Sequence, residues 1–501
     1  MKGFVIHMKK KIQSVICILL TVVLCFSSAS IAFAKEKVTP VILVHGLGAS
    51  AVYENAGTEN QTEIQNLGLG DIASGIFSNT DIIFEVLKML DPARKTNADT
   101  FINSLANLVS SSNLNCTKDG NVKKGQGIAN YWTDSLNNHK EYWQDAYSAE
   151  PGIARQLCKS VGAKNVYLFA YDWRQDICAT AKNLNSYIKS VKKQTGAKKV
   201  TLVGCSLGGS VLSAYIDAYK NNKELDRCIF VNPAFQGVDV ARAYALDITF
   251  KKQDIMNYIK CMESAFDNGS KKSLFKFLGA AFDVRIGYAC DYLNAFVKNK
   301  SNVKKLYNKV LKPWIGNIPA LWECIPYDSF DKAVKEMSKI GFLDKKSGVY
   351  KKIKKYHGVQ GRLSKNLKAI KKQGVQVAVI ANYGQMGIPL TSKAANQTDS
   401  LIDTKYASGG ATTAKYGKKL KAKGKYVSAD KAINAKTCIL PDNTWFIRNL
   451  GHVDFIFATQ ATVFVANLAT GKVKCNLKAV EKKYKYKQFV HSDSKQNLKN
   501  I

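Results

Sequence analysis

A serine flanked by glycines is the first feature of this 501-residue sequence that could do chemistry. Gly204-Cys205-Ser206-Leu207-Gly208 follows a β-branched run that begins at Val200, and an apolar pattern with helical spacing continues to Ile216. A serine on a sharp strand-to-helix turn is strained and exposed, and glycines on either side leave room for the neighbouring backbone. The pattern therefore predicts that Ser206 is a nucleophile.

A nucleophilic serine needs hydrogen-bond donors for the oxyanion that its attack creates. The predicted strand Pro40–Val44 leads into His45-Gly46-Leu47-Gly48, a loop of the type that presents a backbone N–H beside the serine. We expect the oxyanion hole to consist of the N–H groups of Leu47 and Leu207. His45 is expected to shape the loop, because the catalytic histidine of an α/β-hydrolase comes last in the chain.

The serine also needs a base that removes its proton. His452 follows the predicted strand Thr444–Ile447 by a short loop and opens a helical pattern, which is the position expected for a catalytic histidine. His357 is the alternative, but its lysine-rich surroundings are typical of a surface or of a cap over the site. We therefore predict that His452 is the base.

The third member of the triad is an acid that holds the imidazole in one tautomer and stabilises its charged form. It should follow the predicted strand Val375–Ala381 and precede the histidine. Asp399 is the preferred candidate and Asp403 is its close rival. Asp442 is a weaker candidate, because it lies in what looks like the turn before the last strand.

These residues need a sheet that brings them to one edge. Continuous apolar strands that alternate with helical patterns are typical of a parallel sheet covered on both faces. The sequence thus predicts an α/β-hydrolase fold with a mostly parallel central sheet and an inserted helical cap. The predicted strands are Pro40–Val44, Val166–Tyr171, Val200–Val203, Cys228–Val231, Val375–Ala381 and Thr444–Ile447.

The chain divides by composition around this core. An aromatic and lysine-rich helical segment without a convincing strand interrupts the sheet and predicts the cap, and an Asn- and Ser-rich stretch predicts an excursion near the site. The predicted parts are a signal peptide at 1–34, a first core segment at 35–237 with an excursion at about 51–150, a cap at 238–365, a second core segment at 366–475 and a basic, loose tail at 476–501.

The N-terminus predicts export. A basic stretch, an apolar run and Ala32-Phe33-Ala34 are the three parts of a cleavable signal peptide, so the mature chain is expected to be secreted or cell-surface associated. The alternative is an uncleaved anchor, because the apolar run is nearly long enough to span a bilayer.

The formal charge of +36 is strongly basic, and loss of the first 34 residues, which hold four lysines and no acid, leaves +32. Such a field favours an anionic membrane or cell-wall surface. Only eight of the 74 basic residues are arginine, the type that reads base edges, and no nucleic-acid-binding motif is present, so nucleic acid is not expected as a partner.

Ten cysteines remain after the leader, and an even number in an exported chain permits disulfides. No C-x-x-C pair exists and the spacings match no zinc framework, so neither a metal nor another cofactor is expected. Cys205 and Cys228 lie in or beside predicted buried strands, where a free thiol is the expected state.

Several motifs together resemble the lecithin:cholesterol acyltransferase family over most of residues 38–470. In that family the serine, acid and histidine align with Ser206, Asp399 and His452, and the cap meets lipid. His45 stands where the animal acyltransferases have proline, a feature shared with bacterial lipase-type relatives. The motifs are Pro40–Val44 with its following glycines, Tyr171-Asp172-Trp173-Arg174, Gly204–Gly208, Pro319–Pro326 and Asp399-x-x-Ile402.

The resemblance implies a serine hydrolase of lipid esters, or an O-acyltransferase, that works through an acyl-enzyme and needs no cofactor. Asp172 and Arg174 are expected to pair and brace their loop, while Trp173 and Trp322 are candidates for substrate contact, with core packing as the alternative. The alternative function is a catalytically silent cell-surface protein that holds anionic polymer or membrane through its lysines. Hydrolysis and acyl transfer both stay open.

Overall fold

The computed structural model describes residues 38–64, 88, 97–110, 112–144, 149–265, 283–456 and 458–501. By its contacts the chain divides into Met1–Val38 and Thr39–Ile501, and the account below concerns the second unit. The predicted signal peptide lies outside the described residues. No helix within these residues is long and apolar enough to cross a membrane.

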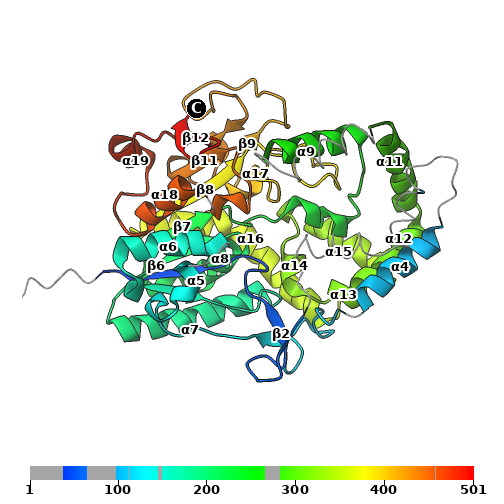
Figure 1. Ribbon diagram of the computed structural model, residues 1–501, viewed down its shortest axis with the longest axis horizontal. Coiled ribbons are helices and arrows are strands. Elements are labelled where there is room, and N and C mark those ends of the chain that lie inside the picture. The colour runs from blue at the N-terminus through cyan, green and yellow to red at the C-terminus, as the bar shows by residue number, and fades with distance from the viewer. Residues whose placement is uncertain are drawn as a thin grey trace, which may run out of the picture. The chain divides into compact units, whose positions relative to one another are not determined.

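An eight-stranded sheet forms the centre of this unit (Figure 1). Its strand order is β13-β12-β11-β8-β7-β6-β1-β5, and every neighbouring pair is parallel except β12 and β13. This is the predicted α/β-hydrolase fold. The strands are β1 Val41–Val44, β5 Val166–Phe169, β6 Val200–Cys205, β7 Leu225–Val231, β8 Gln376–Tyr383, β11 Thr444–Arg448, β12 Phe489–Ser492 and β13 Leu498–Asn500.

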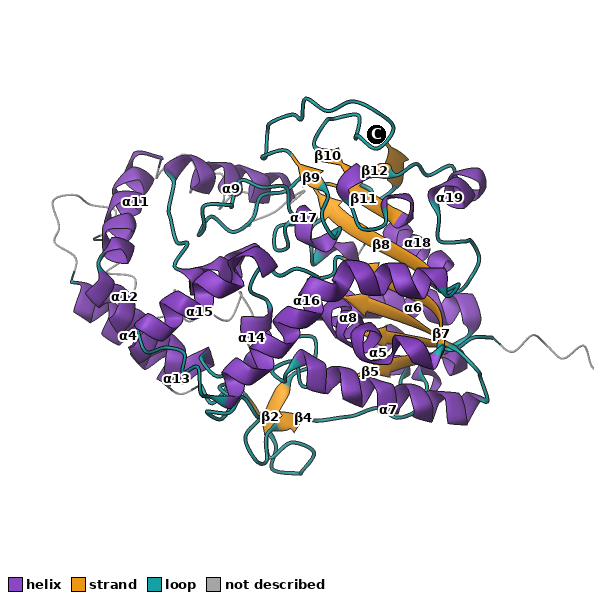
Figure 2. Ribbon diagram, turned by 180° about the vertical axis from the view of Figure 1, so that it is seen from behind, coloured by secondary structure: helices purple, strands orange, loops and turns teal. Residues whose placement is uncertain are grey.

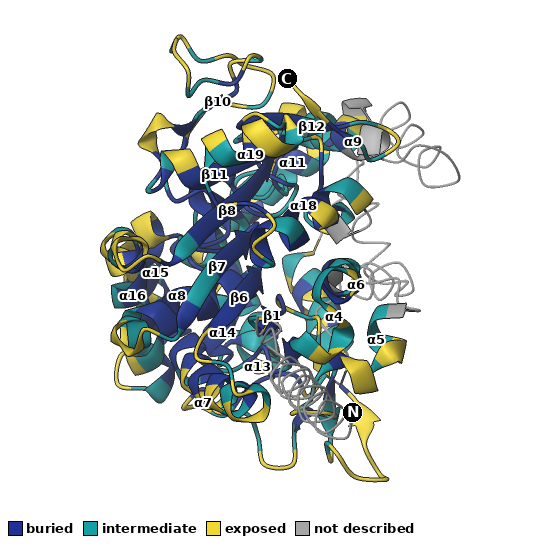
Figure 3. Ribbon diagram, turned by 90° about the vertical axis from the view of Figure 1, so that its left-hand side faces the viewer, coloured by how far each residue is buried: buried dark blue, intermediate teal, exposed yellow. Residues whose placement is uncertain are grey.

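Helices cover both faces of the sheet, which explains why its strands are apolar throughout (Figure 2). Alternate residues of β1 point to opposite sides: Ile42 packs in the cluster beneath α7, α8 and α16, and Leu43 in the cluster beneath α6 and α18. In Figure 3 the strands are buried while the outer faces of these helices are exposed. The covering helices are α6 Ala149–Val161, α7 Ile177–Thr195, α8 Leu207–Tyr219, α16 Gly348–Lys372 and α18 Thr459–Ala469.

The cap consists of helices and turns in its described part. Helix α4, from the predicted excursion, packs against it through Ile102, Phe296 and Val310. The elements are α4 Ala98–Ser110, η4 Asp239–Ala245, α9 Lys252–Ala265, α11 Asp283–Lys298, α12 Lys300–Leu306, the π-helical turn η5 Tyr307–Leu311, α13 Lys312–Ile315, α14 Pro319–Glu323, η6 Tyr327–Ser329 and α15 Phe330–Lys339.

The predicted end of the cap at residue 365 is wrong. Residue 365 lies inside α16, which packs on α8 and belongs to the layer that covers the sheet. The cap therefore ends before Gly348, where Ser347 accepts a hydrogen bond from the N–H of Tyr350 and starts the helix.

The C-terminal segment is not the loose tail that its lysines suggested. It forms α19 Leu477–Tyr484 and the strands β12 and β13, which extend the central sheet beyond β11. Phe489 stacks on Phe446 of β11 with ring centroids 5.4 Å apart. Phe489 and Val490 are the only apolar residues of β12. They are enough for a strand here because β12 forms hydrogen bonds with the edge of β11.

Smaller elements complete the described chain. A three-stranded sheet stands in the excursion, and a two-stranded sheet stands between the acid-bearing loop and β11. These elements are β2 Val52–Glu54, β3 Thr62–Glu63, β4 Gly127–Ile128, η1 Leu136–Asn138, α5 Lys140–Gln144, η2 Ala163–Asn165, η3 Lys220–Asn222, α17 Thr404–Ala407, β9 Thr412–Thr413, β10 Ile433–Asn434, η7 Ala435–Thr437, η8 Pro441–Asn443 and η9 Asp454–Ile456.

Candidate active site

The three predicted triad residues follow three parallel strands at the same edge of the sheet. Ser206 follows β6, Asp399 lies in the loop after β8, and His452 lies in the loop after β11. The carboxyl ends of parallel strands are where α/β sheets bind their ligands.

Backbone hydrogen bonds at the strand ends link these loops. The N–H of Ser206 donates to Val231 O at 3.0 Å, and the N–H of Asn449 donates to Tyr383 O at 2.9 Å. Between them, the N–H of Asn232 donates to Ile380 O at 2.8 Å, so the ends of β6, β7, β8 and β11 are held in one register.

Ser206 occupies the sharp turn that its sequence predicts. Its φ of 53° and ψ of −119° are strained for a residue with a side chain. A Cβ on Gly208 would lie 2.2 Å from Val44 O, and one on Gly209 would lie 2.4 Å from Pro233 Cβ. The glycines are therefore required because the turn touches the end of β1 and the loop after β7.

The two backbone groups predicted for the oxyanion hole belong to the elements that meet at this turn. Leu207 is the first residue of α8, and Leu47 lies in the loop after β1. Among the described residues, neither N–H donates a hydrogen bond. Their role as oxyanion donors stays a prediction.

Asp399 and His452 are in direct contact. Asp399 Oδ2 lies 2.6 Å from His452 Nδ1, and the N–H of His452 donates to Asp399 O at 2.6 Å. The other carboxylate oxygen, Oδ1, accepts from the N–H groups of Leu401 at 3.1 Å and Ile402 at 2.7 Å. Asp399 is 1% exposed, so the carboxylate is fixed by backbone donors and aimed at the imidazole.

The Ser206 hydroxyl is not joined to this pair by a hydrogen bond within the described contacts. Catalytic hydrogen bonds are often long in enzymes without substrate and tighten when substrate binds. The structure thus brings two of the three predicted residues into contact and places the third at the same edge of the sheet.

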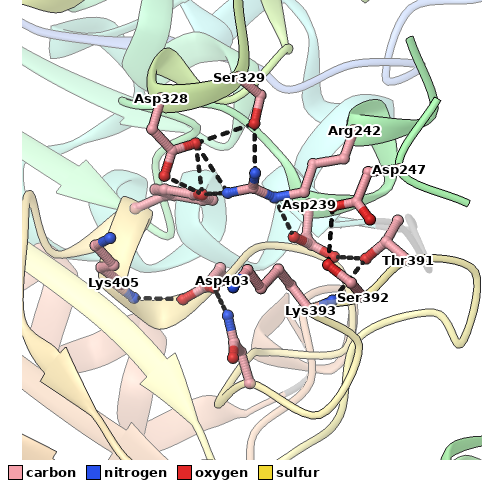
Figure 4. A network of polar contacts seen from close by, with 12 residues as sticks. Asp239, Arg242, Asp247, Asp328, Ser329, Thr391, Ser392, Lys393, Asp403 and Lys405 are labelled. Carbon is pink, nitrogen blue, oxygen red and sulfur yellow. Dashed lines mark hydrogen bonds and ion pairs between the residues drawn. The ribbon is translucent and has the colours of Figure 1, made fainter. Parts of the chain in front are cut away.

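Asp403, the rival candidate for the acid, accepts hydrogen bonds from its own loop and does not contact His452 in the described contacts. Its Oδ1 accepts from the N–H of Lys405 at 2.8 Å at the start of α17, and its Oδ2 accepts from Asn396 Nδ2 at 2.7 Å (Figure 4). Burial raises the pKa of Asp403 to about 6. Asp442 accepts a hydrogen bond from Tyr426 OH at 2.9 Å and precedes β11, at the opposite end of that strand from His452.

A buried polar network ties the acid-bearing loop to the cap, and sequence analysis missed it. Arg242 of η4 donates to Asp239 and Asp328 of the cap, each at 2.9 Å, and also to Tyr406 OH of α17 (Figure 4). Thr391 donates to Asp239 from the same loop that holds Asp399. The one feature of the sequence that could have indicated this network is Arg242 itself, because most basic residues of the chain are lysines.

His45 braces its loop, as expected from its position. Its Nδ1 donates to Gly46 O at 2.8 Å, because its Nε2 accepts from the N–H of Tyr171 at 3.2 Å. Ser50 Oγ lies 2.9 Å from the same Nε2, and the ring stacks on Tyr171 with centroids 4.2 Å apart. His45 is 2% exposed and both ring nitrogens are engaged.

His357 lies in α16, away from the strand ends. Its ring stacks on Phe330 with centroids 4.0 Å apart and on Tyr327 at 4.6 Å. Burial lowers its pKa. The ring therefore packs the cap against the layer of helices, which agrees with the sequence-based preference for His452.

The predicted pair of Asp172 and Arg174 is confirmed. Arg174 Nε donates to Asp172 Oδ1 at 3.0 Å and an Nη donates to Asp172 Oδ2 at 2.7 Å, with both side chains 0% exposed. Arg174 also donates to Leu114 O at 3.1 Å and to Gln126 at 2.9 Å. The pair therefore holds the excursion against the loop after β5.

The two tryptophans proposed for substrate contact are both fully buried. Trp322 donates from Nε1 to Gly316 O at 2.8 Å and packs on Tyr244 with ring centroids 4.4 Å apart. Trp173 Nε1 is buried without a hydrogen-bond partner. These environments favour packing, and substrate contact by either residue stays a prediction.

Cysteine and metal chemistry have no support in the described residues. The ten described cysteines are buried and form no disulfide, and burial raises the pKa of Cys158 and Cys324 to about 12. Within the described ranges, no group of three or more His, Cys, Asp or Glu side chains could hold a metal ion.

Comparison with known proteins adds little. No model of a known protein family matches the chain, and no curated protein matches it. A Tle4–Tli4 complex is similar at 10% identity and TM-score 0.28 over 69% of this chain and 75% of that one. Phospholipase PlaB from Legionella pneumophila matches at 17% identity and TM-score 0.16 over 27% of this chain and 31% of that one.

The N-acyl homoserine lactonase AidH is similar at 14% identity and TM-score 0.22 over 65% of this chain and 85% of that one. Scores this low carry no argument about activity. The α/β-hydrolase fold stands on the strand order and on the placement of the strand-end loops described above.

Proposed function

We propose that this chain is an exported serine hydrolase of lipid esters, or an O-acyltransferase, with Ser206, Asp399 and His452 as its triad. The contact of 2.6 Å between Asp399 and His452 carries the proposal, because it joins residues 53 positions apart at the edge where a strained serine turn ends β6. A buried carboxylate on Nδ1 holds the imidazole in the tautomer whose Nε2 can accept a proton.

The reaction would follow from these positions. His452 takes the proton of the Ser206 hydroxyl as Ser206 Oγ attacks the ester carbonyl, and the N–H groups of Leu47 and Leu207 receive the oxyanion. The protonated imidazole then gives its proton to the leaving alcohol, which leaves an acyl-enzyme. Water or a second alcohol, activated by His452, releases the acyl group as acid or as a new ester.

A lipid substrate is favoured by the motif resemblance and by two exposed apolar side chains. Leu47 is 37% exposed beside a proposed oxyanion donor, and Val453 is 62% exposed directly after His452. Apolar groups in these places suit an acyl chain. Export rests on the N-terminal sequence, and cleavage is proposed near Ala34.

Labelling with a fluorophosphonate probe tests the chemistry. The wild-type chain should be labelled and should hydrolyse p-nitrophenyl butyrate, whereas Ser206→Ala should lose labelling and at least about 10³-fold in turnover with its melting temperature nearly unchanged. Ser213→Ala is a matched control, because Ser213 lies in α8 and its hydroxyl donates to Ser210 O within the helix. An unlabelled wild-type chain would contradict the proposal and favour a catalytically silent binding protein.

Adding a soluble alcohol to the assay separates the two forms of the proposal. A new ester among the products indicates acyl transfer, and free acid alone indicates hydrolysis.

A further inference from the structure

A polar pocket of about 570 Å³ lies at the carboxyl ends of β8 and β11. Its walls come from the ends of both strands, from Gln397 in the acid-bearing loop and from the segment 416–432, and Cys261 of the cap helix α9 contributes to its lining. Gln397 lies two residues before Asp399, and Asn449 lies three residues before His452. The pocket therefore shares its walls with the two segments that carry the proposed acid and base.

The backbone holds this pocket open. Gly384 has a φ of 98° and Asn449 a φ of 59°, so both strands turn away sharply where they end. A Cβ on Gly384 would lie 2.8 Å from Asn449 Oδ1. The N–H of Asn449 donates to Tyr383 O at 2.9 Å, which fixes the two turns against each other.

The charges that line the pocket are mainly positive. Lys418, Lys419 and Arg448 face a single carboxylate, that of Asp430. Arg448 Nε lies 3.4 Å from Asp430 Oδ2, so Asp430 already has a cation. Neither Lys418 nor Lys419 has a carboxylate partner among the described residues.

Two buried amide side chains add uncharged donors. Gln385 is 5% exposed and Gln397 is 4% exposed, yet both line the pocket. Gln397 Oε1 accepts from the N–H of Gly384 at 3.1 Å, and Gln385 Oε1 is buried without a partner. In the described part of the chain, neither Nε2 group has a hydrogen-bond partner. The two Nε2 groups are therefore available as hydrogen-bond donors to an anion in the pocket.

We propose that this pocket binds a phosphate group. A planar carboxylate is best recognised by the fork of an arginine, but Arg448 is already paired with Asp430 through its Nε. What remains are two lysine point charges and two amide N–H₂ groups, which suit a tetrahedral anion approached from several sides. The volume also leaves room for a group attached to the phosphate.

The consequence for substrate choice rests on the proposed ester hydrolysis, whereas the phosphate binding does not. If the chain is a hydrolase, a phosphate seated here places the ester of the same molecule near the ends of β8 and β11. The pocket would then select phosphate-bearing esters over uncharged ones.

Calorimetric titration of the full chain with inorganic phosphate and with glycerol 3-phosphate tests the binding. The double variant Lys418→Gln with Lys419→Gln should weaken affinity at least about tenfold, the effect of removing charged hydrogen bonds worth roughly 1.5 kcal/mol or more. The double variant Lys421→Gln with Lys423→Gln removes the same charge from the same loop outside the pocket and should bind as the wild type does. Equal losses in both variants, or no saturable binding by the wild type, would overturn the proposal.

The two probes distinguish the source of the phosphate. Tighter binding of glycerol 3-phosphate supports a lipid head group, and equal binding supports free phosphate. Ser206→Ala should still bind both probes. A wild-type chain that binds them but turns over no ester would retain the pocket and reject the hydrolase. For an active chain, Lys418→Gln with Lys419→Gln should lose the preference for short-chain phosphatidylglycerol over p-nitrophenyl butyrate, and an undiminished preference would contradict the selective role.

Discussion

Asp399 and Asp403 show how strongly the surroundings of a residue decide its role. Both are 1% exposed and both accept backbone hydrogen bonds. Only Asp399 has an oxygen left for an imidazole, because the second oxygen of Asp403 is occupied by Asn396. Spacing along the sequence ranked Asp399 first, but the competing bonds of Asp403 depend on a fold that spacing does not reveal.

Replacing each acid in turn tests this difference. Asp399→Asn should lower ester turnover about 10³–10⁴-fold, because the amide favours the wrong imidazole tautomer and does not stabilise its charged form. Asp403→Asn should retain activity, because asparagine starts a helix about as well as aspartate does. Steady-state kinetics of both variants decides the matter, and the opposite ranking would reassign the acid.

Arg174 is the arginine whose partner was predicted from the sequence. The other basic residues were interpreted together as a surface charge. Of the seven arginines that the structure describes, however, five pair with aspartates, among them Arg174 and Arg242 at buried positions. A guanidinium fork fits a carboxylate better than an ammonium does. In a lysine-rich chain, arginines are therefore worth reading as candidates for fixed ion pairs.

Glu323 predicts a pH dependence of stability. It is 3% exposed in α14, its Oε2 accepts from the N–H of Ile177 at 2.9 Å, and its Oε1 has no hydrogen-bond partner. Burial, with a contribution from the Asp176 carboxylate, raises its pKa well above the ordinary value of 4.5. The folded chain thus holds this proton more tightly than the unfolded chain does, and this site lowers the free energy of unfolding as the pH rises above about 4.5.

Glu323→Gln should remove that loss, since glutamine keeps the acceptor for Ile177 and has no proton to lose. Thermal melts at pH 5 and pH 8 should show a smaller drop for this variant than for the wild type. Glu336→Gln is the control, because Glu336 pairs with Lys339 on the surface of α15. A parallel decline in Glu323→Gln and the wild type would contradict the prediction.

At the level of elements, the central strands were predictable because burial on both faces makes them continuously apolar. All six predicted strands exist, with ends that differ by a few residues. The strands β12 and β13 were missed because they lie at the edge, are short and are flanked by lysines. The end of the cap was misplaced because α16 has the same lysine-rich composition as the cap that precedes it.

The C-terminal strands should therefore contribute to stability. Phe489→Ala should lower the free energy of unfolding by about 3 kcal/mol, because Phe489 is 7% exposed and packs on Phe446. Lys487→Gln, two residues earlier, should change it little. Urea unfolding measures both, and equal stabilities would mean that the segment is the loose tail that composition suggested.

At the level of the whole molecule, the lysines outnumber the carboxylates that could pair with them. The full chain has 74 basic and 38 acidic residues, and many of the described acids are engaged by arginine or by the backbone. Fold and triad are readable from apolar runs and turn motifs. The sequence gives the size of the positive charge, but composition does not identify the anionic surface that the lysines would bind.

The net charge predicts where a lipid-ester hydrolase of this kind would work. A formal +32 after the predicted cleavage should concentrate the chain on anionic vesicles, so turnover at low ionic strength should be higher on anionic than on zwitterionic vesicles of the same ester. The difference should shrink as salt is added, because the screening length falls to about 10 Å at 0.1 M. Turnover of p-nitrophenyl butyrate should scarcely respond, since the proposed chemistry of Ser206 needs no surface. Equal rates on both vesicle types across the salt series would mean that the lysines serve another purpose, such as attachment to the cell wall.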